Sequence, residues 1–159
     1  MALLQARWGF LANDLTLLCE TGAGIDVLCC PQRIHVTAET ASFFPELRAL
    51  ASPRQGKAGF RVEDIYPDAA VDRAPARGLL FAQVRKDQPT RLRRLSAQEA
   101  LVALLPQSFA PWDREHAPAQ LALLGQLVET IPPYRIELGT DLDRLPALLA
   151  GLIEETPDT

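Results

Sequence analysis

The sequence has little of several residue types that mark common classes of protein. It holds 3 cysteines, 2 histidines and 1 methionine in 159 residues, and aromatic residues make up 6%. Cys29 and Cys30 are adjacent, and Cys19 is not in C-x-x-C spacing with either. This spacing argues against a thiolate metal site and favours small, buried apolar residues. His35 stands alone in an apolar alternation, which is more typical of a structural histidine than of a ligand or base.

Long hydrophobic runs and a secretory start are also missing. No window approaches the roughly 18 unbroken apolar residues of a membrane helix. Residues 1–8 show no basic start followed by an apolar stretch and a small-residue cleavage site. We therefore expect a cytoplasmic protein with no membrane partner. The length and the 48% hydrophobic content predict a single domain over residues 1–159.

An excess of positive charge is absent as well. The formal net charge is −4 and the pI is about 5.2, which argues against a protein that binds nucleic acid through its phosphates. One local exception is a basic cluster made of Arg85, Lys86, Arg91, Arg93 and Arg94. A solvated hairpin with charged edges is favoured over an anion or partner site for this cluster.

Hydrophobic periodicity predicts a mixed α/β protein. Alternation and turn residues indicate strands, and apolar residues at helical spacing indicate helices. Ser96-Ala97-Gln98-Glu99 is a capping box that opens the clearest helix, and Asp141 or Asp143 is expected to cap the last one. The predicted order begins with a helix end at 2–7 stopped by Gly9, a buried central strand within 8–18, and a hairpin with strands near 15–20 and 25–30. A strand at 31–36, a helix within 37–50 and a short strand at 59–62 follow. The rest is predicted to be a hairpin of 78–84 with 90–95, helices at 96–106 and 118–131, a strand at 134–138 and a final helix.

The polar pair Asn13-Asp14 interrupts the apolar stretch from Trp8 to Leu18. A carboxylate in a buried strand is costly unless a metal, a cation or several N–H groups satisfy it. In P-loop nucleotide enzymes, an aspartate at the end of an apolar strand holds Mg²⁺ beside the phosphates. The alternative is a bulge or bend in which Asp14 accepts backbone hydrogen bonds, and residue types alone favour this alternative.

Several motifs along the chain, taken in order, resemble one known family. The matched segments are Trp8 to Leu18, Pro31-Gln32-Arg33-Ile34, Phe44-Pro45-Glu46-Leu47, residues 76–84, the helix from Leu95-Ser96 to Phe109, and Pro133 to Gly139. Together they resemble the kinases related to HPr kinase/phosphorylase, whose catalytic fold is that of ATP-type phosphoenolpyruvate carboxykinase. The resemblance implies such a fold in part, with a mixed β-sheet and C-terminal helices.

The resemblance also implies an activity, that of an ATP-dependent serine kinase with a protein or peptide phosphoacceptor. The family's catalytic acidic pair falls on Asn13 and Asp14, with Asp14 as the Mg²⁺ ligand beside ATP. Asn13 departs from the usual acidic residue, because an amide can coordinate a metal but cannot act as a base.

The phosphate-binding loop G-x-x-x-x-G-K-[ST] does not occur in the 159 residues. The chain therefore resembles the part of such a kinase downstream of that loop. We expect the isolated chain to be inactive, because Mg²⁺ is normally bound by carboxylates together with the nucleotide's phosphates. The alternative is a non-catalytic binding module that retains the fold. A missing N-terminal half would leave strand edges and apolar surface uncovered, which predicts a homo-oligomer or poor solubility.

Overall fold

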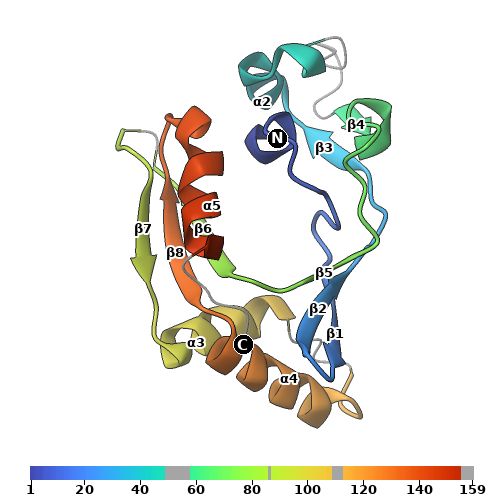
Figure 1. Cartoon of the computed structure of the whole chain (residues 1–159), viewed down its shortest axis with the longest axis vertical. Helices are drawn as coiled ribbons and strands as arrows, with labels where there is room; N and C mark the ends of the chain where they lie inside the picture. The colour runs from blue at the N-terminus through green and yellow to red at the C-terminus, as the bar shows by residue number, and fades with distance from the viewer. Residues whose placement is uncertain (49–57, 86, 109–112, 155–159) are drawn as a thin grey trace. The chain divides into compact units, whose positions relative to one another are not determined.

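The computed structural model describes residues 1–48, 58–85, 87–108 and 113–154 (Figure 1). The chain divides into two compact units, the first made of Met1–Cys19 and Asp26–Ala74 and the second of Glu20–Ile25 and Pro75–Thr159. The structure is mixed α/β, with three small sheets among the described residues. None of the described helices has the length and apolar character needed to cross a membrane.

The first unit begins with a short helix, α1 (Ala2–Gln5), whose end differs from the prediction. Arg7, with φ of 64°, occupies the left-handed position after the helix, where Gly9 was expected to act as the stop. The amides of Arg7 and Trp8 donate to the carbonyls of Leu4 and Leu3, both at 3.0 Å, as in a Schellman motif. Gly9 has another role, since a Cβ there would lie 2.6 Å from a methyl group of Val71.

The core of the first unit lies around a two-stranded antiparallel sheet. In this sheet β3 (Ile34–Val36) pairs with β4 (Ala58–Phe60), and Ile34 is opposite Phe60. The side chain of Thr37 caps α2 (Ala38–Phe43) by accepting from the amide of Thr40. Two 3₁₀ helices follow, η1 (Pro45–Leu47) and η2 (Val62–Asp64). Leu47 and Phe60, 0% and 2% exposed, are the largest fully buried side chains.

The buried central strand expected within residues 8–18 is wrong. Phe10 makes an isolated bridge to Ala70, residues 13–14 form a bend, and the regular strand β1 (Leu17–Thr21) starts only at Leu17. Leu15 and Leu17 are 53% and 42% exposed, so this stretch is not buried on two faces.

The hairpin predicted after this stretch is confirmed. β1 is followed by β2 (Gly24–Leu28), and Gly24 takes the positive φ of 131° that the turn requires. The strand order is β1-β2-β5, where β5 (Arg73–Pro75) is a strand that the predicted order did not include.

The second unit holds a three-stranded mixed sheet in the order β6-β8-β7. β6 (Leu79–Val84) and β7 (Arg91–Arg94) were expected to pair as a hairpin, and this prediction is wrong. β8 (Pro133–Leu138) lies between them, parallel to β6 and antiparallel to β7. Ile136 of β8 is 3% exposed, which is consistent with the central position.

Helices of the second unit largely follow the prediction. They are α3 (Ala97–Ser108), α4 (Ala117–Thr130) and α5 (Leu145–Glu154), the last preceded by the 3₁₀ helix η3 (Leu142–Arg144). α3 continues two residues beyond Pro106. Asp141 does not cap η3 through its side chain. Its carboxylate instead accepts from the amide and hydroxyl of Thr90, at 2.8 and 2.6 Å, which ties the segment before β7 to the segment after β8.

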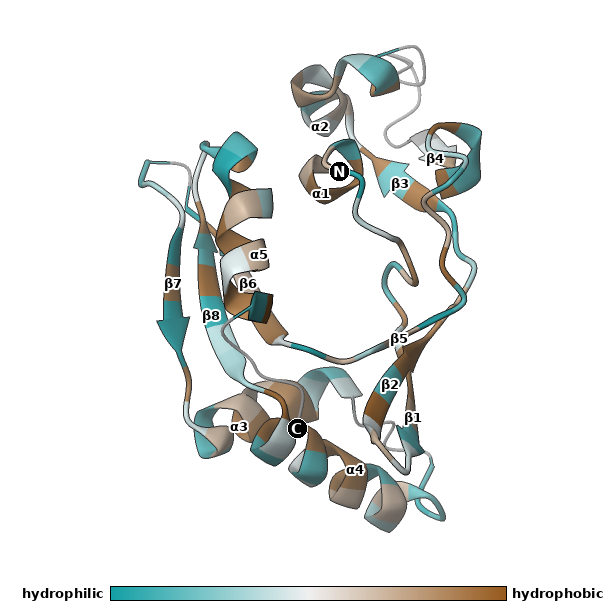
Figure 2. Cartoon of the chain, viewed as in Figure 1, coloured by the Kyte–Doolittle hydropathy of each residue, from teal (hydrophilic) through white to brown (hydrophobic). Residues whose placement is uncertain are grey.

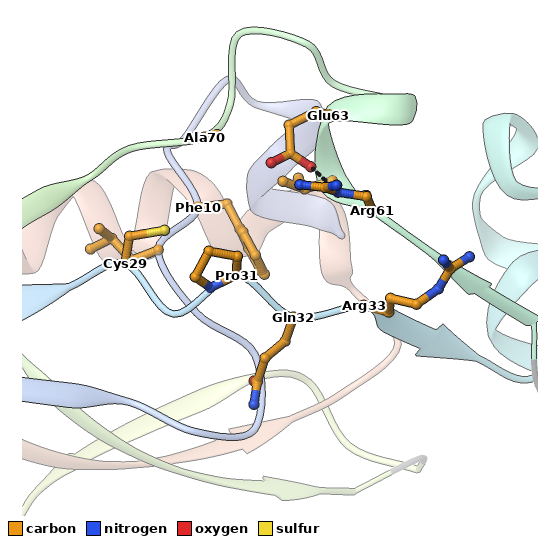
Figure 3. Close-up of a pocket in the computed structure, with 10 residues that line it drawn as sticks. Phe10, Cys29, Pro31, Gln32, Arg33, Arg61, Glu63 and Ala70 are labelled. Atoms are coloured by element: carbon orange, nitrogen blue, oxygen red, sulfur yellow. Dashed lines mark ion pairs between the residues drawn. The ribbon is translucent and has the colours of Figure 1, made fainter.

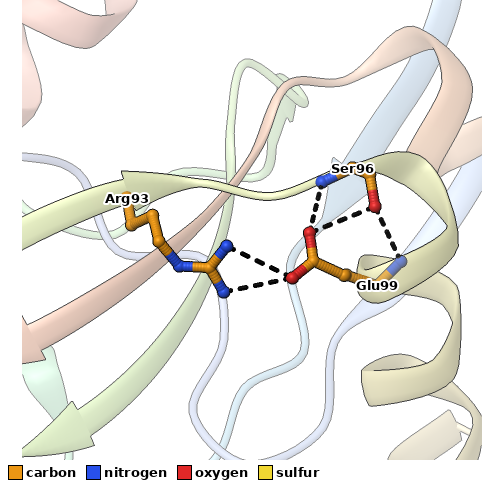
Figure 4. Close-up of polar contacts among 3 residues, drawn as sticks. All are labelled: Arg93, Ser96 and Glu99. Atoms are coloured by element: carbon orange, nitrogen blue, oxygen red, sulfur yellow. Dashed lines mark hydrogen bonds and ion pairs between the residues drawn. The ribbon is translucent and has the colours of Figure 1, made fainter.

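The capping box at α3 is confirmed (Figure 4). The amide of Ser96 donates to Glu99 Oε2 at 2.9 Å, and the amide of Glu99 donates to Ser96 Oγ at 3.2 Å. Arg93 adds two contacts of 3.2 Å to Glu99 Oε1. The backbone hydrogen bond from Ser96, followed by the bond from Arg93, lowers the pKa of Glu99 below its ordinary value.

Replacing Arg7 with glycine is expected to stabilise the protein. A non-glycine residue in the left-handed region carries a cost of about 1 kcal/mol that glycine avoids. Arg7→Gly should therefore raise the free energy of unfolding by about 0.5–1 kcal/mol in denaturant titrations. Ala6→Gly is the matched control and should lower it, because Ala6 has a negative φ of −83°. A loss of stability in Arg7→Gly would contradict the left-handed conformation of Arg7.

Acid is expected to weaken the start of α3 through Glu99. The folded-state pKa lies below the ordinary value of 4.5, so the stabilisation is present above that pH. It is lost as the pH falls through the folded-state pKa. The protection factors of amides in the first turn of α3, which are corrected for the intrinsic exchange rate at each pH, should fall with acidification in the native chain and vary less in Glu99→Gln. Glu129→Gln, at an exposed position of α4, should behave as the native chain does.

Candidate functional site

The bend at Asn13-Asp14 is held by residues that come just before β3. Gln32 Oε1 accepts from the amides of Asp14 at 3.1 Å and Leu15 at 3.2 Å. Asn13 Nδ2 donates to the carbonyl of Arg33 at 3.3 Å. Because one side-chain oxygen takes two successive N–H groups, those groups are not available to a neighbouring strand. This accounts for the late start of β1.

The carboxylate of Asp14 is exposed. It makes no hydrogen bond or ion pair with any described residue. The alternative reading of the pair as a bend is therefore supported, but the group that satisfies the bend is Gln32 and not the Asp14 side chain. The role of Asp14 as a metal ligand stays a prediction.

The residues at the bend suit one mode of Mg²⁺ binding only. No cluster of three or more histidine, cysteine, aspartate or glutamate side chains exists in the described part of the chain. Mg²⁺ commonly uses one or two protein oxygens and takes its other ligands from phosphates and water. Asp14, with the side-chain oxygen of Asn13 beside it in sequence, fits this partial coordination. The bend does not fit a metal site built from protein ligands alone.

A pocket of about 380 Å³ lies beside this bend within the first unit (Figure 3). Its lining residues are Phe10, Leu11, Cys29, Pro31, Gln32, Arg33, Arg61, Val62, Glu63 and Ala70. Arg61 Nε lies 3.7 Å from Glu63 Oε2, and Arg33 Nη2 donates to the carbonyl of Gly59 at 2.8 Å. Figure 3 shows the side chain of Gln32 directed away from Arg61 and Glu63. The pocket lining thus combines apolar side chains with the charged pair Arg61–Glu63.

Sequence reasoning missed Gln32. It stands between Pro31 and Arg33 in the sequence, where no local pattern distinguishes it. Only the fold shows that it reaches a segment 18 residues earlier.

The remaining candidate residues are dispersed. Cys29 and Cys30 are half-buried free thiols, Cys19 is half-buried as well, and Cys29 lines the pocket. His35 is exposed, and its ring lies so close to Gly59 that a Cβ there would meet it at 2.9 Å.

The basic cluster is not a hairpin, because β8 separates its two strands. Arg85 Nε lies 3.8 Å from Glu137 Oε1, and the guanidinium carbon of Arg94 lies 5.5 Å from the ring centre of Tyr134. Lys86 lies outside the described residues.

A second polar centre of the first unit surrounds Glu46. The hydroxyl of Tyr66 and the side-chain Nε2 of Gln5 both donate to Glu46 Oε1, the latter at 2.9 Å. Burial raises the pKa of Tyr66, and its hydrogen bond to Glu46 raises that pKa further. These bonds connect α1, η1 and the segment after η2, so the centre has a structural role.

No protein-family model, no curated protein and no solved structure matches the chain.

Removing the Gln32 side chain is expected to loosen the bend selectively. Gln32→Ala frees two amides, and the loss of one hydrogen bond is worth about 1 kcal/mol. Hydrogen exchange at Asp14 and Leu15 should accelerate, while exchange in α3 stays unchanged. Gln98→Ala, at an exposed position of α3, serves as the control. Equal acceleration in both variants would show that Gln32 does not hold the bend.

Proposed function

We propose that the chain contributes the Asp14 part of a Mg·ATP site in an ATP-dependent serine kinase of the HPr-kinase-related type, acting on a protein or peptide. The observation that carries the proposal is the exposed carboxylate of Asp14 in a bend whose amides are satisfied by another residue. A carboxylate that is not needed for the local fold is available for a ligand.

Two of the motifs on which the resemblance depends also meet in space. The Trp8–Leu18 stretch and the Pro31–Ile34 segment are joined by the bonds of Gln32 and Arg33 described above. Residues from distant matched motifs that gather at one bend support a shared site. The adjacent pocket of about 380 Å³ offers space for part of a ligand.

The two residues of the pair would have different roles. Bound Mg²⁺ would neutralise charge on the transferred phosphoryl group. Asp14 would provide its ligand, and as the one ionisable member of the pair it is also the candidate to accept a proton from the acceptor hydroxyl. Asn13 would orient groups by hydrogen bonding, because an amide takes up no proton at neutral pH. Phosphates would need further donors, since the sequence has no glycine-rich phosphate loop.

A second candidate function is a non-catalytic binding module. It is favoured by Asn13 and by the apolar side chains on β6, where Val84 is 66% and Leu80 38% exposed. β6 is an edge strand among the described residues, so a second copy could cover it. This function predicts a stable complex in solution and no nucleotide effect.

The kinase proposal predicts that Mg·ATP stabilises the longest in-frame product containing this chain. A ligand at about 100 times its Kd adds roughly 2.7 kcal/mol, which corresponds to a shift in Tm of about 5–10 °C. Asp14→Ala should abolish the shift in a thermal melt. Asp68→Ala, which changes another exposed aspartate of the first unit, should retain it.

ATP without Mg²⁺ should give a smaller shift than Mg·ATP. A flat melt in the longer product, or an equal loss in Asp14→Ala and Asp68→Ala, would overturn the proposal. A flat melt combined with a stable dimer in sedimentation would favour the binding module.

A further inference from the structure

One face of the β6-β8-β7 sheet carries a row of arginines. Residues directly opposite in neighbouring strands project from the same face. Arg91 is opposite Glu137, and Arg93 is opposite Arg135. Arg91, Arg93 and Arg135 are all exposed. We call these three residues the arginine face.

Nearby carboxylates neutralise only part of the positive charge of the arginine face. Arg93 contacts Glu99 Oε1, but Glu99 Oε2 is already bound to Ser96 (Figure 4). Glu137 lies 3.8 Å from Arg85. Arg91 and Arg135 make no hydrogen bond or ion pair with the residues that the structure describes. Positive charge therefore remains on a protein whose net charge is −4.

The pair Arg93–Arg135 is unfavourable for the fold. Like charges directly opposite each other destabilise a sheet. An anion between or beside the two guanidinium groups would remove this repulsion. A negatively charged partner would therefore bind favourably to the arginine face.

The neighbouring edge of β7 indicates the form of that partner. β7 pairs with β8 alone among the described strands. The amide of Leu95 donates to the carbonyl of Pro133 at 2.9 Å. Bonded and non-bonded pairs alternate in an antiparallel ladder, so the backbone groups of Leu92 and Arg94 point to the open side. Figure 2 shows that much of β7 is hydrophilic, as on a solvent-facing edge.

We propose that this edge binds an extended acidic segment of a partner protein by strand addition. Side chains of an added strand alternate between faces, so every second residue would lie beside Arg91 and Arg93. Acidic residues at those positions would complement the arginine face. Glu99 and Glu137 within the face disfavour a continuous polyanion such as nucleic acid. The inference is independent of the kinase proposal.

The test measures fluorescence polarisation of a labelled peptide of alternating glutamate and valine, at low and moderate salt. Each exposed charge pair contributes up to about 1 kcal/mol, so Arg91→Gln and Arg135→Gln should each weaken binding up to about fivefold. Arg114→Gln, an exposed arginine of the second unit outside the sheet, should bind as the native chain does. Two further peptides carry methyl groups on the backbone nitrogens of the glutamates alone or of the valines alone. One of the two should bind poorly, because only every second amide of an added strand is directed at β7.

Stability provides a second readout with the opposite sign. Without peptide, Arg135→Gln removes the like-charge pair, so its Tm at low salt should equal or exceed that of the native chain. Lower affinity with undiminished stability separates lost recognition from unfolding. The proposal is overturned by no peptide binding, by equal loss in Arg114→Gln, by full binding of both methylated peptides, or by tighter binding of a single-stranded oligonucleotide.

Discussion

The two hydrogen bonds that Gln32 Oε1 accepts from Asp14 and Leu15 are the constraint on which the first unit's candidate site depends. They remove two successive amides from strand pairing. The chain therefore bends at residues 13–14, and β1 starts at Leu17. The same bonds place the Pro31–Ile34 segment against the bend, with the pocket beside it. A single side-chain amide thus decides the course of the backbone and the exposure of Asp14.

Local features of the fold were predictable from the sequence. The capping box of Ser96 and Glu99 and the left-handed glycine at Gly24 act over a few residues, so their patterns suffice. The strand order was not predictable in the same way. β8 lies between β6 and β7, although it follows β7 by about 40 residues in the chain. The central position of β8 is the one that buries its residue Ile136. Periodicity shows that a strand exists, but not its neighbours.

In the candidate site, too, local features were predictable from the sequence and long-range contacts were not. The sequence marks Asn13-Asp14 as a break in an apolar stretch, and the structure confirms the break. The expected burial of residues 8–18 was wrong. The apolar run was interpreted as a central strand, whereas the amides of Asp14 and Leu15 bond to the side chain of Gln32. The pocket combines residues from four separated segments, from Phe10 to Ala70, and no spacing rule links them. Position in sequence located the polar pair, while long-range bonds determined its surroundings.

Asp14 and the pair Arg93–Arg135 are places among the described residues where charge adds little to the stability of the fold. The carboxylate of Asp14 has no bond to a described residue, and Arg93 faces Arg135 across a ladder where opposite charges would be more stable. Elsewhere the polar groups are well used: Asp141 joins Thr90, Glu99 joins Ser96, and Glu46 joins Tyr66 and Gln5. Charged side chains that make no such contact, as at Asp14 and Arg135, are candidates for binding a ligand or partner. The contrast is sharpest at Asp14, because the bend is already satisfied by Gln32 and would not need a carboxylate.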